Sequence, residues 1–308
     1  MARTVIELPG GMTQRPPTVA DVAAITELIA ACEEHDDGVA EIDPEDLDMA
    51  FGRVGWDPST DGILVFDGEV PVAWAEVYRD RAEADVRPSH RGRGLGVALL
   101  AWTEDRGREL GLGELGQTKT AANTGARELF SSNGYRRAWE SWILRIELDE
   151  PPPAPIVPDG VSIRTYDSAR DERMVHRVWE DAISAARGRE PDPLDVWASQ
   201  SIAHAAFAPE LSKVALDGER VVGALLAYDF PDASEVWIGQ VATAASHRRQ
   251  GIAGALLRTV FAASREIGRE RCGLSTDSWT GARRLYERNG MRVVRTYARW
   301  AKALTQPG

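Results

Sequence analysis

The sequence predicts an α/β protein made of two tandem domains, each with a mixed central sheet flanked by helices. Three observations lead to this fold class: the length of the chain, a duplicated set of motifs, and a proline-rich segment between the two copies. A chain of 308 residues suits two hydrophobic cores of about 150 residues each better than one large core.

The duplication consists of two phrases that recur in the same order. TGARELFSSNG begins at Thr124 and TGARRLYERNG begins at Thr280, with seven of the eleven positions identical. SHRGRGLGVALL begins at Ser89 and SHRRQGIAGALL begins at Ser246. The two pairs are offset by 156 and 157 residues. Because self-similarity at a nearly constant spacing is typical of repeated structural units, each copy is expected to form one domain.

A segment with five prolines lies between the copies, at residues 148–160. Proline is not tolerated in a helix interior or a central strand, so this segment is expected to be an extended linker. The predicted domains are therefore residues 1–147 and residues 161–308.

Each copy contains the same order of expected elements. A short strand is followed by a helix, a hairpin with an Asp-Gly turn, another strand, a glycine-rich loop, a long amphipathic helix, a strand, a short helix and a final strand. Thr18, with Asp21 three residues later, predicts a capped start for the first helix. The long helices are expected at residues 95–110 and 252–267.

Composition narrows the classes of function. A content of 43% hydrophobic and 27% charged residues is typical of a folded soluble protein, and no apolar run reaches the ~20 residues of a membrane span. A net charge of -12 argues against binding to nucleic acid or anionic membranes and mildly favours a cationic or amine substrate. The N-terminus lacks a signal-peptide core and two cysteines form no disulfide framework, so we expect a cytoplasmic protein.

Several kinds of catalytic or metal site have no motif in this sequence. There is no G-x-S-x-G, and the five histidines have no metal-ligand spacing, so no metal is expected. Cys32 and Cys272 are expected to be buried packing residues rather than nucleophiles.

Two glycine-rich loops carry the clearest functional pattern. RGRGLG at 91–96 and RRQGIA at 248–253 each connect an expected strand to a helix. Small residues let the backbone approach a ligand, and a helix start presents unpaired N–H groups, so the combination suits a pyrophosphate. A single such loop is equally explained as an Arg-rich surface turn, but two in the same context favour phosphate. The pattern is not a nucleotide P-loop or a dinucleotide fingerprint, because there is no GK[ST] and Val97 stands where a third glycine is required.

The motifs resemble those of the GCN5-related N-acetyltransferases. Their R-x-x-G-x-[GA] loop is present in both copies, and the phrases that begin at Ala126 and Ala282 are similar to the helix motif that closes the family's domain, except that Met291 replaces its final aromatic residue. The resemblance covers nearly the whole chain. It implies two such domains in tandem, with acetyl-CoA as the acyl donor and a small-molecule amine as the acceptor; it implies nothing about the oligomeric state.

The resemblance also implies which residues hold the acyl-CoA. In the family these are the end of the strand before the loop and the loop itself. In the second copy they are Val241, Thr243, Arg248, Arg249, Gln250, Gly251, Ile252, Ala253 and Gly254, and in the first copy Arg91, Gly92, Arg93, Gly94, Leu95 and Gly96.

Tyr286 is the expected general acid. In the family a tyrosine at this helix position is proposed to protonate the departing thiolate, and a hydroxyl with a pKa near 10 can do so. The alternative is that Tyr286 only packs in the core, as Phe130 does at the same position of the first copy.

Glu235 is the expected general base, on the strand before the second loop. It shares a strand face with Val241 and Thr243, and a two-domain member of the family places a base glutamate there. A solvated edge carboxylate is the alternative, and Asp277 is the next candidate. The first copy has Phe130 in place of a tyrosine and a shorter, more polar strand, so it is expected to bind acyl-CoA with weak or no catalysis.

The acidic run at residues 33–48 has two interpretations. It borders the acceptor side in the family and would attract a cationic acceptor, but a solvated face is the favoured interpretation. Three functions follow from the whole sequence: an N-acetyltransferase acting on a small amine, a variant of it acting on a cysteinyl pseudodisaccharide, and a non-catalytic acyl-CoA-binding regulator or scaffold.

Overall fold

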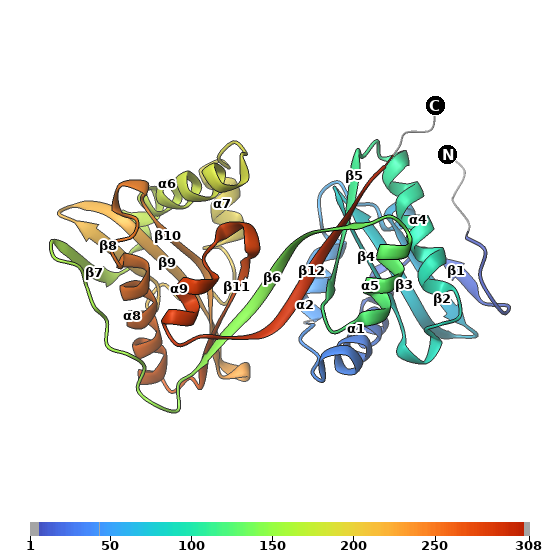
Figure 1. Ribbon diagram of the computed structural model, residues 1–308, viewed down its shortest axis with the longest axis horizontal. Helices are drawn as coiled ribbons and strands as arrows, with labels where there is room; N and C mark the ends of the chain where they lie inside the picture. Colours follow the sequence, from blue (N-terminus) through green and yellow to red (C-terminus); the bar gives the residue numbers. More distant parts are fainter. Residues whose placement is uncertain (1–5, 43, 305–308) are drawn as a thin grey trace. The chain divides into compact units, whose positions relative to one another are not determined.

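The computed structural model describes residues 6–42 and 44–304, and it confirms the expected α/β class, with mixed β-sheet structure flanked by helices (Figure 1). The chain divides into two compact units. Unit 1 is Met1–Glu140 together with Thr296–Gly308, and unit 2 is Ser141–Arg295. Within the described residues, no helix is long and apolar enough to cross a membrane.

In unit 1 the neighbouring strands of the sheet follow the order β1-β2-β3-β4-β5-β12. Its strands are β1 (Thr13–Arg15), β2 (Gly62–Asp67), β3 (Val70–Tyr78), β4 (Arg81–Val86), β5 (Glu114–Thr120) and the part of β12 (Arg292–Ala303) from Thr296 onward. Its helices are α1 (Val22–Asp37), α2 (Pro44–Phe51), α3 (Pro58–Asp61), α4 (Leu95–Glu109) and α5 (Thr124–Ser132). One apolar core packs α1 and α2 around Trp74, and a second packs α4 around Leu99 and Val77. Successive side chains of β3 therefore point to opposite faces of the sheet and pack into both cores.

Unit 2 repeats this plan with strand order β6-β11-β10-β9-β8-β7. Its strands are the part of β6 (Arg136–Glu147) from Ser141 onward, β7 (Val161–Thr165), β8 (Lys213–Asp217), β9 (Arg220–Phe230), β10 (Glu235–Thr243) and β11 (Arg271–Asp277). Its helices are α6 (Ser168–Arg187), α7 (Leu194–Gln200), α8 (Ile252–Glu266) and α9 (Arg283–Arg288). A core around Phe261 lies beneath α8, and another lies beneath α6 and α7 around Trp197.

The last strand of each sequence copy belongs to the other copy's sheet. β12, at the end of the chain, pairs antiparallel with β5 of unit 1, and β6, at the end of the first copy, pairs antiparallel with β11 of unit 2; both can be followed in Figure 1 as long green and red strands. The predicted boundaries, at 147 and 161, therefore do not coincide with the compact units. The proline-rich residues 151–158 form neither helix nor strand.

The two copies keep the same signals at their helix ends. The carboxylate of Asp21 accepts hydrogen bonds from the N–H of Thr18 at 2.8 Å and from the guanidinium of Arg15 at 2.6 Å, just before α1. In unit 2 the buried carboxylate of Asp171 is held by Arg164 in the same way. At their other ends α1 and α6 stop at Gly38 and Gly188, both with left-handed φ. Because both helices end at an equivalent glycine, residues at the same distance before Gly38 and Gly188 occupy equivalent positions in α1 and α6.

Candidate functional site

The two central strands of unit 2 separate near their middle. β10 runs parallel to β11, with Glu235–Ile238 opposite Arg271–Leu274. Beyond that point β10 continues against β9, and β11 continues against β6. The result is a wedge between the two strands, which opens toward the glycine loop that follows β10.

A bulge in β10 lies where the strands part. The pairing of β10 with β9 shifts register between Ile238 and Gln240, so Gly239 is the additional residue. A β-carbon at Gly239 would collide with the ring of Tyr228 on β9, so no larger residue fits without movement. A bulge leaves backbone groups outside the regular ladder, where they are available to a ligand.

The loop of unit 2 has the geometry of an anion cradle. Gly251 caps α8 with φ +93°, and Arg249 also has a positive φ of 64°. No atom lies within 4 Å of a β-carbon built on Gly251, so the space above the first turn of α8 is open. The loop residues Arg248, Arg249, Gln250 and Gly251 are exposed, Ala253 and Gly254 are partly buried, and Ile252 anchors the helix in the core. Open space beside a helix start fits a pyrophosphate group.

The end of β10 meets this loop. The backbone carbonyl of Thr243 accepts a hydrogen bond from Nε of Arg248 at 3.3 Å. The hydroxyl of Thr243 is buried and has no hydrogen-bond partner among the described residues, while Val241 packs against the core. A buried hydroxyl without a partner at the side of the wedge fits a site for a polar ligand chain.

Tyr286 lies on α9 with its hydroxyl at the wedge. The residue is 6% exposed, and burial raises the pKa of its phenol to about 12, an effect that the side chain of Thr276 partly opposes. Thr276 belongs to the part of β11 beyond the last pairing with β10. The phenol is therefore protonated at neutral pH and lies beside the opening between the strands.

Glu235 lies at the beginning of β10, before the bulge. Its side chain is 8% exposed and accepts hydrogen bonds from Nε of Arg145 at 2.8 Å and from Nε of Arg271 at 3.3 Å. The carboxylate leans over Gly273, where a β-carbon would collide with it. Gly273 is three residues before Thr276, a separation of about 10 Å along the strand. The register shift at Gly239 puts Glu235 on the opposite face of β10 from Val241 and Thr243, so the expectation that the three share a strand face is wrong. Among the described residues, no hydrogen bond joins Glu235 to Tyr286.

Asp277, the other carboxylate considered, is at the end of β11. It accepts a hydrogen bond from the hydroxyl of Ser141 and one from the indole N–H of Trp279 at 2.9 Å.

Unit 1 contains the same wedge together with a measurable cavity. β4 pairs with β5 only at Arg81 and Ala82, and the strands then separate. A cavity of about 410 Å³ lies between these two strands and the helices α4 and α5. It is lined mainly by apolar side chains, with polar groups at one wall: Ala84, Asp85, Val86, Arg91, Gly92, Gly94, Gly96, Val97, Leu99, Leu100, Gln117, Lys119, Asn123, Gly125, Ala126, Leu129 and Phe130. Four of the six predicted loop residues line it; Arg93 is exposed to solvent and Leu95 is buried in the core.

Three features of the unit 2 wedge differ in unit 1. The pairing of β4 with β3 runs from Ala73 to Tyr78 without a register shift, so β4 has no bulge. Phe130, in place of a tyrosine, packs against Tyr135 with ring centroids 5.4 Å apart. β4 begins opposite Gly116, the counterpart of Gly273, so this strand has no position equivalent to Glu235.

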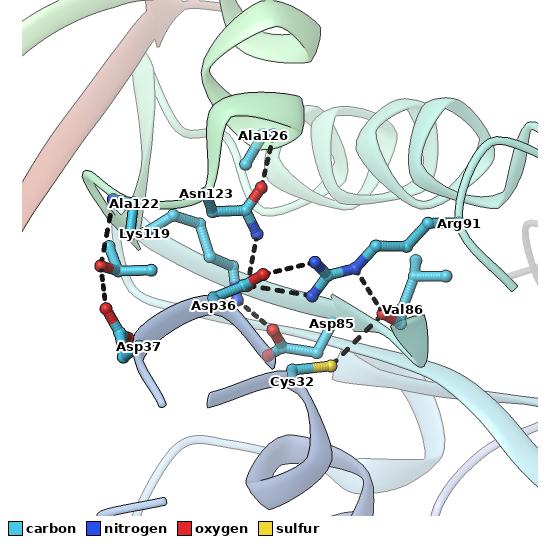
Figure 2. Close-up of polar contacts among 11 residues, drawn as sticks. Cys32, Asp36, Asp37, Asp85, Val86, Arg91, Lys119, Ala122, Asn123 and Ala126 are labelled. Carbon is cyan, nitrogen blue, oxygen red and sulfur yellow. Dashed lines mark hydrogen bonds and ion pairs between the residues drawn. The ribbon is translucent and has the colours of Figure 1, made fainter. Parts of the chain in front are cut away.

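A network of charged side chains closes one side of the unit 1 wedge, as Figure 2 shows. Arg91 donates to both carboxylate oxygens of Asp36 at 2.5 and 3.0 Å, and the amide of Asn123 donates to the same carboxylate at 2.8 Å. Behind them, Lys119 on β5 forms an ion pair with Asp85 on β4 at 2.5 Å. The acidic run is therefore not only a solvated face, because Asp36 binds the loop of its own unit; residue 43 of the run lies outside the described residues.

Nothing in the local sequence pattern indicates these partners. Asp36 and Arg91 are 55 residues apart, and Arg145 and Glu235 are 90 residues apart.

The histidines next to the loops have a structural contact in both copies: His90 bonds to Asp67, and His247 to Asp217, at the Asp-Gly turns. Burial raises the pKa of the Cys32 thiol to about 11 and that of Cys272 to about 12, which keeps both thiols protonated.

A family model described as "Acetyltransferase (GNAT) family" matches the chain twice, at residues 23–135 and 172–291. A solved GCN5-related N-acetyltransferase from Sphaerobacter thermophilus is 33% identical, with a TM-score of 0.82 over 98% of both chains.

The chain is similar to curated relatives that carry the name mycothiol acetyltransferase. That of Thermobispora bispora is 34% identical over 159 residues, 50% of this chain and 51% of the relative, so the match spans about half of that protein's length. That of Geodermatophilus obscurus is 29% identical over 92% of this chain and 95% of the relative.

Proposed function

This chain belongs to the acetyltransferase (GNAT) family, and we propose that it transfers the acetyl group of acetyl-CoA to the amine of a small molecule, with the chemistry in unit 2. The observation that carries this assignment is the combination of the bulge at Gly239 with the open loop at Gly251. Both lie along one wedge, at the two places where a thioester and a pyrophosphate need to be held. Unit 1 has the loop and lacks the bulge.

The chain's own residues would hold the donor along this wedge. The loop 248–254 and the N–H groups at the start of α8 would bind the pyrophosphate, because they present partial positive charge to open space. Val241 and Thr243, at the end of β10, would contact the pantetheine arm. When bound, acetyl-CoA supplies an activated acyl group that an amine can attack directly. In unit 1 the loop 91–96 would bind a second acyl-CoA without turnover.

Tyr286 would act as the general acid. Its phenol has a pKa of about 12, so it carries a proton throughout the neutral range. As the carbon–sulfur bond breaks, the phenol would donate that proton to the departing sulfur. The wedge-side position of Thr276, whose side chain lowers the pKa of this phenol, supports the assignment.

Glu235 would act as the general base. The attacking amine must lose a proton to become a nucleophile, and a carboxylate on the other side of the bulge can accept that proton through a water molecule. Arg145 and Arg271 fix the position of the carboxylate. They also add two positive charges beside the base, which would make this region unfavourable for a second cationic group on the acceptor.

Mycothiol synthase, which acetylates a cysteinyl pseudodisaccharide, is a more specific candidate. It is supported by the relatives named mycothiol acetyltransferase, one of which aligns over 92% of this chain. A non-catalytic acyl-CoA-binding regulator is supported by unit 1, in which a loop persists beside Phe130.

One assay separates these three functions. The release of free CoA from acetyl-CoA would be followed with a panel of amines that includes the cysteinyl pseudodisaccharide, for the wild type and for Tyr286→Phe. Turnover with simple amines supports the general acetyltransferase, and a strong preference for the pseudodisaccharide supports mycothiol synthase. Binding of acetyl-CoA without turnover for any amine overturns the enzymatic assignment.

A further inference from the structure

The end of α1 is attached to the glycine loop of unit 1 through one carboxylate. Asp36 is 10% exposed and accepts two hydrogen bonds from the guanidinium of Arg91 (Figure 2). A bidentate Arg–carboxylate contact of this kind is stronger and more directional than an ion pair with one hydrogen bond. Arg91 also lines the cavity, so the contact lies on the wall of the site that acyl-CoA would enter.

The same carboxylate ties α1 to α5. Asn123 caps α5 by accepting a hydrogen bond from the N–H of Ala126 at 2.8 Å, and its amide nitrogen donates to Asp36. The neighbouring Asp37 accepts a hydrogen bond from the hydroxyl of Thr120, on β5, at 2.7 Å. The last turn of α1 is thereby fastened to the loop, to α5 and to β5.

The cationic side chains of this cavity wall are each paired with a carboxylate. Arg91 is paired with Asp36, and Lys119 is paired with Asp85 across the separated strands. Acyl-CoA carries several negative phosphate charges, and these two cations therefore offer it little net attraction while their carboxylates stay in place.

Unit 2 lacks the carboxylate at the corresponding position. Gly38 and Gly188 end the equivalent helices, so Asp36 corresponds to Ala186, two residues before the glycine. Nε of Arg91 donates to the carbonyl of Val86, at the end of β4, at 3.1 Å. Arg248, the counterpart of Arg91, is exposed and makes the same contact with the preceding strand, from its Nε to the carbonyl of Thr243. The contact between strand and arginine is thus common to both loops, and the carboxylate belongs to unit 1.

We propose that Asp36 is an internal competitor of the acyl-CoA of unit 1. Its carboxylate holds Arg91 in the free protein, and acyl-CoA occupies this cavity only when the last turn of α1 is released from the loop. This inference rests on the proposed function, because it takes the ligand of the loop to be acyl-CoA. Its consequence is that the two loops differ in affinity, with unit 2 filled first and unit 1 filled only at higher concentrations.

The test is calorimetric titration of the full chain with CoA. The wild type is expected to show a tight and a weak binding phase. Gly251→Val should remove the tight phase and Gly94→Val the weak one, because a β-branched residue is strained at φ near +90°. Asp36→Asn keeps the shape of the side chain and removes its charge, so it should strengthen the weak phase about tenfold and leave the tight phase unchanged.

Two matched variants and one further measurement complete the design. Asp36→Glu keeps the charge and should resemble the wild type, and Asp37→Asn removes a neighbouring charge that does not contact Arg91, so it should change the weak phase by less than Asp36→Asn. In the wild type, hydrogen exchange at the amide of Gly38, which bonds to the carbonyl of Glu34, should become faster when CoA fills the weak site.

The proposal is overturned if Asp36→Asn leaves the weak phase unchanged or weakens it, or if filling of the weak site leaves exchange at Gly38 unchanged or slower. A failure of the proposed function has a different signature: no phase is lost in Gly251→Val and no acetyl transfer is measured, whatever residue occupies position 36.

Discussion

Nε of Arg145 on β6 lies 2.8 Å from Oε1 of Glu235 on β10. The arginine comes from the first copy of the repeated sequence and the glutamate from the second, yet both belong to unit 2. The side chain proposed as the base of one copy is therefore positioned by a residue of the other.

Glu235→Gln is expected to lower kcat about 100-fold, because the amide cannot accept a proton from the amine. KM for acetyl-CoA should change little, since Glu235 lies before the bulge and the loop lies after it. Steady-state release of CoA measures both constants. Glu219→Gln, at an exposed position of the hairpin turn, is the matched control, and equal kcat in the two variants would exclude Glu235 as the base.

Tyr286→Phe is expected to lower kcat by about 10- to 100-fold at pH 7 without unfolding the protein. Phe130 occupies the equivalent position of unit 1 and is buried there, so the core accommodates the ring without its hydroxyl. Activity and thermal denaturation of the same preparation test this. A variant with wild-type turnover would leave Tyr286 as a packing residue.

The same substitution makes a prediction for alkaline stability. Burial raises the pKa of Tyr286 to about 12, above the ordinary value of about 10. The unfolded chain ionises first, so the stabilising contribution is complete below pH 10 and is lost as the pH rises through 12. Between pH 8 and pH 11, the free energy of unfolding of the wild type should fall by about 1.4 kcal/mol more than that of Tyr286→Phe. Urea unfolding at the two pH values measures the difference, and parallel losses would contradict it.

Asp21 makes the corresponding prediction in acid. Hydrogen bonding to the Arg15 guanidinium is the largest cause that lowers the pKa of this carboxyl, to about 2. The unfolded chain is protonated first, so the contribution is present above pH 4 and is lost as the pH falls through 2. At pH 7 the free energy of unfolding of the wild type should exceed that of Asp21→Asn by about 2 kcal/mol. This difference should become smaller as the pH falls toward 2. Denaturant titrations across this range would contradict the prediction if the gap stayed constant.

Gly239→Ala tests the bulge. The added methyl group meets the ring of Tyr228, so a loss of about 1–3 kcal/mol in the free energy of unfolding is expected, with a fall in kcat/KM as the strand shifts. Tyr228→Leu in the same chain shortens the opposing side chain and should recover most of the stability. If activity falls without any change in stability, steric crowding at the bulge is not the reason.

Local pattern was sufficient for the elements that the two copies share. α4 and α8 begin at Leu95 and Ile252, as expected. A glycine precedes each helix, where the backbone has a positive φ, and the same motif in both copies supported the same helix start in each. The Asp-Gly turns were recognisable for the same reason, with positive φ at Gly68 and Gly218.

The contacts that distinguish the two units could not be read in this way. Asp36 was part of an acidic run whose spacing is typical of a solvated helix, and its binding to Arg91 depends on how α1 crosses the end of β4. Similarly, no local signal reveals that β6 leaves its own copy to pair with β11, because either sheet satisfies its backbone hydrogen bonds equally well.

The exchange of terminal strands bears on how such a chain evolves after duplication. A gene that lost its first half would also lose β6, and with it Arg145 beside Glu235 and the edge that covers β11. A gene that lost its second half would lose β12 and expose β5. Each half thus supplies a strand that pairs with a strand of the other copy, so either half would be retained for that strand even if its own site lost its chemistry.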